Sequence, residues 1–222
     1  MHDSPLHALR LEIATRAARL IAEEGLDYAG AKRRAAREVT GEGRNTVRGD
    51  CLPDNAQIEN EVRAYQALFM ADTQPARLRA LRASAVEVMR WLTAFRPHLV
   101  GAVLNGTAGD HSDIHLQLYC DSAKEVEIFL INAGVDFETS ESASHHGRAG
   151  SEPVETLSFV WRRAWQPGEI PPPAEGVHLT ILRFDDLRIA SRAATERADL
   201  SDVEALLADP QSDLSAVSPR IS

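Results

Sequence analysis

Residues 113–118, Asp-Ile-His-Leu-Gln-Leu, alternate polar and apolar side chains over six positions. Alternation with a period of two predicts a half-buried strand, with Asp113 and His115 on one face and Ile114 and Leu116 on the other. An apolar run over residues 100–104 comes before it and stops at Gly106-Thr107, where a short polar loop begins. This stretch therefore predicts two strands of a sheet with polar side chains at the start of the second strand.

The chain before residue 99 has the periodicity of helices. Apolar residues recur at helical spacing up to Gly25, which ends the first predicted helix. A second helix is expected over about residues 27–39, followed by a glycine-rich polar loop. Asp54 and Gln57 form a capping box for a third helix through Phe69. A fourth begins near Thr73-Pro75 and ends before Pro97.

Strands predominate after residue 98. Strands are predicted over residues 135–140, 154–162 and 177–184, a helix over 122–132, and a short helix capped by Ser201 with Glu204. The predicted fold class is α+β: a helical N-terminal region, residues 1–98, followed by a mixed-sheet core, residues 99–190. Residues 191–222 are expected to form the short helix and a tail that is disordered after Pro210.

Composition excludes several classes of protein. A formal net charge of −9 argues against a general nucleic-acid or anionic-membrane surface. No apolar run approaches the length of a membrane span, the first residues lack a signal-peptide core, and the two cysteines lack metal-ligand spacing, so a cytoplasmic protein is expected. Neither Lys32 nor Lys124 follows a glycine, so phosphate-loop ATPase and kinase chemistry has no support.

The stretch Gly106-Thr107 followed by Ser112-Asp113-Ile114 resembles the signature of the DNA polymerase β-like nucleotidyltransferase superfamily. In that family a strand ends in Gly-Ser, and a second strand carries two carboxylates that bind divalent metal ions with a third from a later strand. The resemblance covers roughly residues 99–163. It implies that Gly106, Thr107 and Ser112 contact the nucleotide, that Asp113 binds metal, and that Glu155 is the third ligand or general base.

His115 departs from that pattern because it stands where the family has its second carboxylate. A neutral imidazole contributes no negative charge, and Mg²⁺ prefers oxygen ligands. The expected metal set is therefore Asp113, His115 and Glu155, with Mg²⁺ or Mn²⁺, or Zn²⁺ because of the histidine. The loop of residues 108–112 is also shorter than the family usually has.

Three functions remain open from the sequence. The resemblance implies transfer of a nucleoside monophosphate from an NTP to an unknown acceptor, with activity that is retained, weak or lost. The second is a non-catalytic nucleotide-sensing or interaction module that uses the same pocket. The third is a DNA-binding regulator that uses the basic helix with Lys32, Arg33, Arg34 and Arg37. A further candidate metal cluster is the set of five histidines His111, His115, His145, His146 and His178, although His178 can also be read as a hydrogen-bonded sheet histidine.

Overall fold

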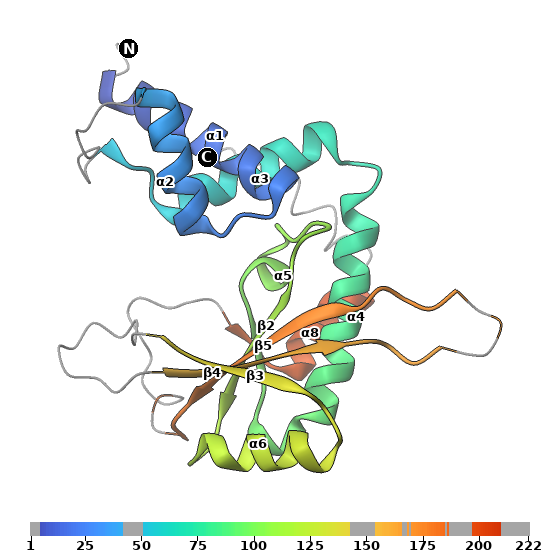
Figure 1. The fold of residues 1–222 in the computed structure, drawn as a ribbon. Helices are drawn as coiled ribbons and strands as arrows, with labels where there is room; N and C mark the ends of the chain where they lie inside the picture. Colours follow the sequence, from blue (N-terminus) through green and yellow to red (C-terminus); the bar gives the residue numbers. More distant parts are fainter. Residues whose placement is uncertain are drawn as a thin grey trace. The chain divides into compact units, whose positions relative to one another are not determined.

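The computed structural model describes residues 5–41, 51–142, 154–165, 168, 170–184, 186 and 197–209. These residues form seven α-helices and a six-stranded mixed sheet, with helices preceding the sheet, which confirms the α+β prediction (Figure 1). The chain divides into two compact units. One contains the helices up to Arg77 together with the segment Gly106–His111, and the other contains the sheet and residues Leu78–Asn105. Neither unit is one continuous segment of chain.

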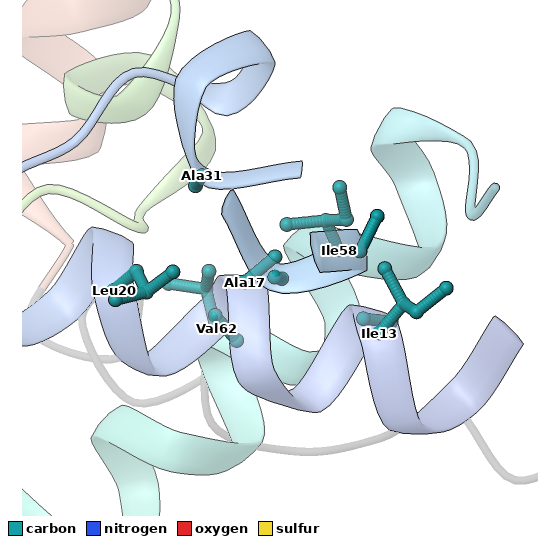
Figure 2. Packing of buried hydrophobic residues seen from close by; sticks show 10 residues of the cluster. Ile13, Ala17, Leu20, Ala31, Ile58 and Val62 are labelled. Atoms are coloured by element: carbon teal, nitrogen blue, oxygen red, sulfur yellow. The ribbon is translucent and has the colours of Figure 1, made fainter. Parts of the chain in front are cut away.

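The helical unit is built from α1 (Pro5–Glu24), α2 (Tyr28–Thr40) and α3 (Asn55–Phe69). Its core is made of small and branched apolar side chains, and Figure 2 labels six of them: Ile13, Ala17, Leu20, Ala31, Ile58 and Val62. All six are 0–1% exposed. The alanines of α1 and α2 allow these two helices to approach closely, while Ile58 and Val62 of α3 fill the remaining space.

Local capping explains where these helices begin and end. Gly25 has a positive φ of 69° and directly follows α1, as expected of a helix-ending glycine. The side chain of Asp27 accepts a hydrogen bond from the Gly30 amide at the start of α2. Asp54 and Gln57 form the predicted capping box of α3.

The sheet unit has the strand order β3-β4-β5-β2-β1-β6. The strands are β1 (His98–Val100), β2 (Ile114–Tyr119), β3 (Phe137–Ser142), β4 (Val154–Trp161), β5 (Glu175–Leu182) and β6 (Arg197–Ala198). The central pair, β2 and β5, is parallel, and every other neighbouring pair is antiparallel.

Helices cover one face of this sheet, which we call the covered face. Leu116, Leu157 and Val177 project from it and are fully buried. Trp91 of α4 (Gln74–Trp91) packs between this face and α6 (Ala123–Asn132), with ring centroids 5.0 Å from Phe129 and 5.4 Å from Trp161. We call the opposite face, which carries His115, Gln117, Thr156, Ser158, His178 and Thr180, the polar face.

Some elements differ from the expectation. The apolar run over residues 100–104 is mostly the short helix α5 (Ala102–Asn105), which begins after Gly101 takes a positive φ of 73°. Helix α8 (Leu200–Ala208) is capped by Asp199 with Asp202 rather than by Ser201 with Glu204, because Asp199 directly precedes the helix and its side chain accepts a hydrogen bond from the Asp202 amide. Strand β6 was not predicted. The expected tail after Pro210 and the pair His145-His146 lie outside the described residues.

No helix in the described part of the chain is both long and apolar enough to span a membrane.

Candidate functional site on the polar face

Asp113 and His115 lie where the period-two pattern predicted them. Ile114 and Leu116 are fully buried on the covered face, whereas Asp113 and His115 are exposed on the other side. Strand β2 therefore presents a carboxylate and an imidazole to the polar face at its N-terminal end.

The parallel pairing of β2 with β5 brings His178 next to both residues. His115 and His178 are direct partners in the register, and their rings stack with centroids 4.8 Å apart. His178 Nε2 lies 3.1 Å from Asp113 Oδ2, and His178 Nδ1 lies 2.8 Å from the Ser158 hydroxyl on β4. Ser158 is the antiparallel register partner of His178. Asp113, His178 and Ser158 thus form one hydrogen-bonded row across three adjacent strands. His178 is therefore a hydrogen-bonded histidine within the sheet, one of the two roles considered for it from the sequence.

The donors in this row follow from what each group can do. An ionised carboxylate only accepts hydrogen bonds, so the proton of the neutral His178 ring belongs on Nε2, facing Asp113. Nδ1 is then an acceptor, and the Ser158 hydroxyl donates to it. The carboxylate therefore fixes the tautomer in which His178 can receive a proton from Ser158.

His115 has a different electrostatic setting from a solvated histidine. Crowding of its ring by protein atoms lowers its pKa, the neighbouring His178 lowers it further, and Asp113 opposes both effects. The lowered pKa favours the uncharged form of His115, whose ring stacks flat against His178.

Gly176 creates the space for the Asp113 carboxylate. A Cβ at position 176 would run into Oδ1 and Cγ of Asp113. Gly176 directly precedes Val177, the register partner of Ile114, so the bare backbone lies level with Asp113. The carboxylate therefore rests against the backbone of β5, within reach of His178.

Glu155 does not lie with Asp113 and His115, the residues with which the sequence predicted it to form a site. Glu155 has the same strand parity as Leu157 and Phe159, so it projects from the covered face. The pKa of Glu155 is raised by partial burial and by Glu127 of α6, in keeping with its position on the covered face. Along the sheet it is also about five residues, roughly 16 Å, from the level of Asp113.

Gly106 and Thr107, the predicted nucleotide contacts, belong to the helical unit. The buried side chain of Gln74 donates to the carbonyls of Gly106 and Ala108 at 3.0 and 2.9 Å, and buried Gln66 donates to the carbonyl of Thr107 at 2.8 Å. The Thr107 side chain lies 3.5 Å from the Tyr28 hydroxyl. The segment is thus tied to α3 and the start of α4, and Thr107 is only 3% exposed.

Ser112, the remaining predicted contact, is half-buried and belongs to the sheet unit with Asp113. Gly106 and Thr107 lie in the other unit.

The two metal ions that the resemblance implies do not fit the donors present. A two-metal site needs carboxylates that neutralise and bridge the ions. Of the predicted ligands, Asp113 is the one carboxylate on the polar face, and its Oδ2 is hydrogen-bonded to His178. The second predicted ligand on this face, His115, is an imidazole and not a carboxylate. Within the described ranges, no group of three or more His, Cys, Asp or Glu side chains is arranged to hold a metal ion.

Arg34 and Lys32 of the basic helix α2 have intramolecular partners. Arg34 is paired with Glu24 and Glu38, and Lys32 donates to Asn55 at 3.1 Å. A side chain neutralised by neighbouring carboxylates, as Arg34 is, is less able to contact phosphates, so these contacts give the DNA-binding alternative no added support.

A comparison with protein-family models gives no match, and a comparison with curated proteins gives none. The nucleotidyltransferase resemblance therefore remains a prediction.

Sequence reasoning missed the roles of Ser158 and Gly176. Alternation in β4 and β5 already indicated the faces: Ser158 opposes Leu157 and Phe159, and His178 opposes Val177 and Leu179. The missing information was the register, which joins residues 65 positions apart in the case of Asp113 and His178.

Proposed function

We propose that the chain is a nucleotide-binding domain of the nucleotidyltransferase type that no longer carries out two-metal nucleotidyl transfer. The observation that carries the loss of transfer is the position of Glu155 on the covered face, while imidazoles flank Asp113 on the polar face. A transfer reaction that places charge on the phosphates needs metal ions to neutralise it, and one carboxylate is a poor substitute for three.

Nucleotide binding is supported by the Gly106-Thr107 and Ser112-Asp113-Ile114 motifs. Gln74 holds the carbonyls of Gly106 and Ala108, and Gln66 holds the carbonyl of Thr107 between them, so the loop keeps one backbone conformation. A loop that is already ordered loses less conformational entropy when a ligand binds to it.

Binding calorimetry of the full chain with ATP, GTP and CTP tests the proposal, in the presence and absence of Mg²⁺ or Mn²⁺. We expect at least one nucleotide to bind, and binding to be weakened in Gln74→Met, because the loop carbonyls are then no longer held. The absence of binding by folded wild-type protein would refute nucleotide recognition.

Pyrophosphate release in the presence of hydroxyl acceptors is the complementary measurement. We expect none above background. Release that disappears in Asp113→Asn would show that transfer has been retained, and this domain would then be an active enzyme. A cytoplasmic location belongs to the same proposal.

A further inference from the structure

The row Asp113–His178–Ser158 has the connectivity of a serine nucleophile with its base. We propose that Ser158 is a reactive nucleophile that takes acyl groups from neutral activated esters, with His178 as the general base and Asp113 as the positioning residue. This activity goes beyond nucleotide binding and does not depend on it. The two hydrogen bonds, 2.8 Å from Ser158 Oγ to Nδ1 and 3.1 Å from Nε2 to Asp113, carry the argument.

The protons of the His178 ring and of the Ser158 hydroxyl lie where this chemistry requires them. Nε2–H is directed to the carboxylate, so Nδ1 has a lone pair for the serine proton. When Nδ1 accepts that proton, the positive charge on the ring is stabilised by Asp113 on the other side. A histidine that lacked the carboxylate could adopt either tautomer and would often present an N–H to Ser158 instead.

Ser158 and His178 stand on strands and Asp113 directly precedes one, which limits their motion. Ser158 and His178 are register partners of an antiparallel pair. His115 stacks on the His178 ring, and Gly176 lets the Asp113 carboxylate approach β5. Side chains held by strands and close packing keep their geometry better than side chains on loops. Ser158 itself is half-buried, so a small reagent can reach it.

The charges around Ser158 select the class of substrate. Glu138 on β3 is the register partner of Ser158, is exposed, and lies on the same face. With Asp113 in the row, two carboxylates lie near Ser158. They disfavour a negatively charged ester at this position, so neutral esters with a good leaving group are favoured over charged ones.

The reaction is balanced by the ester and water alone. Ser158 Oγ attacks the ester carbonyl carbon as its proton moves to His178 Nδ1, and a tetrahedral adduct forms. The bond from carbon to the leaving oxygen breaks, the alcohol or phenol departs with the proton from His178, and Ser158 keeps the acyl group. Water then releases the acid by the same route, with His178 again accepting and returning the proton.

The test uses the full chain with p-nitrophenyl acetate and with a fluorophosphonate probe, which reacts with activated serines. We expect release of p-nitrophenol and a label that mass spectrometry locates on Ser158 of the wild-type protein. Wild-type labelling that falls on other residues, or on none, would overturn the proposal without the use of any variant.

Variants then assign the roles. Ser158→Ala should lose the label, and His178→Gln should slow the reaction by about 10²-fold or more, within the usual range for a general base. Ser158→Cys should recover acylation, because a thiol replaces the hydroxyl. Thr156→Val, which changes the next polar-face residue of β4, is the matched control and should react like wild type. Equal rates of p-nitrophenol release by wild type and Ser158→Ala would show that Ser158 is not the nucleophile.

Asp113 needs a measurement that a purely structural role would not change. Nitrogen NMR of the His178 ring should show the proton on Nε2 in the wild type, and Asp113→Asn should abolish that preference while the amide spectrum stays dispersed. If the tautomer is unchanged in a folded Asp113→Asn protein, Asp113 does not position His178.

Discussion

At the scale of single residues, the hydrogen bond between Asp113 and His178 depends on Gly176, which has no side chain to occupy the space of the carboxylate. Asp113 can bond to His178 because β5 has only backbone at the level of the carboxylate. The sequence predicted that Asp113 and His115 share a face, but nothing local to Gly176 indicated a carboxylate above it. A close approach between residues 63 positions apart is a tertiary property that strand periodicity does not contain.

Gly176→Ala is expected to destabilise the protein by about 1–3 kcal/mol, the usual cost of forcing an extra methyl into occupied space. Urea unfolding measures this change. Adding Asp113→Ala should recover most of the loss, because the added methyl then occupies the space that the carboxylate leaves. Gly109→Ala is the control, since a Cβ there makes only an ordinary contact 3.8 Å from Gln66. A Gly176→Ala protein as stable as wild type would show that the carboxylate moves aside freely.

At the scale of elements, β4 shows how far strand periodicity can be used. Leu157 and Phe159 mark one face as apolar, and Glu155 has their parity, so the pattern itself placed Glu155 on the covered face. The resemblance to a family motif pointed the other way. The periodicity of the strand was the better guide, because alternation is a direct consequence of backbone geometry.

The position of Glu155 gives stability a definite dependence on pH. Its pKa is raised by partial burial, then by Glu127 and Glu141. A raised folded-state pKa means that the folded protein holds the proton more tightly, so stability is lost as pH rises above the unfolded value of about 4.3.

Glu155→Gln should therefore raise the urea midpoint at pH 7 and leave it nearly unchanged at pH 4, because an amide cannot ionise and can donate to Glu127. Glu138→Gln, on the polar face, is the control and should not show this difference. An equal change in midpoint at the two pH values would contradict the electrostatic explanation.

At the scale of the whole molecule, the division into units is the feature that the sequence did not contain. Helical and strand periodicity gave the correct fold class and a boundary at residue 98. The structure instead assigns Leu78–Asn105 to the sheet unit and Gly106–His111 to the helical unit. The buried glutamines tie residues 106–108 to the helical unit, and these hydrogen bonds to backbone carbonyls leave no signature in the sequence of the loop.

The double variant Gln66→Met/Gln74→Met tests how these glutamines support the helical unit. It leaves three buried carbonyl groups without these donors, and each lost partner costs about 1–3 kcal/mol.

Trp91, Trp161 and Trp165 all belong to the sheet unit, so tryptophan fluorescence reports that unit, while circular dichroism follows the helices of both. Loss of the glutamine hydrogen bonds loosens the six-residue segment Gly106–His111, which connects two parts of the sheet unit. The stability of the sheet unit should change little, because loop-closure entropy depends only weakly on loop length. We therefore expect the variant to unfold at lower urea by circular dichroism, with a smaller shift by fluorescence. Hydrogen exchange should become faster in residues 103–111 and stay unchanged in β4 and β5. Equal shifts by both probes, with faster exchange throughout the sheet, would show instead that the glutamines hold the chain together as one cooperative block.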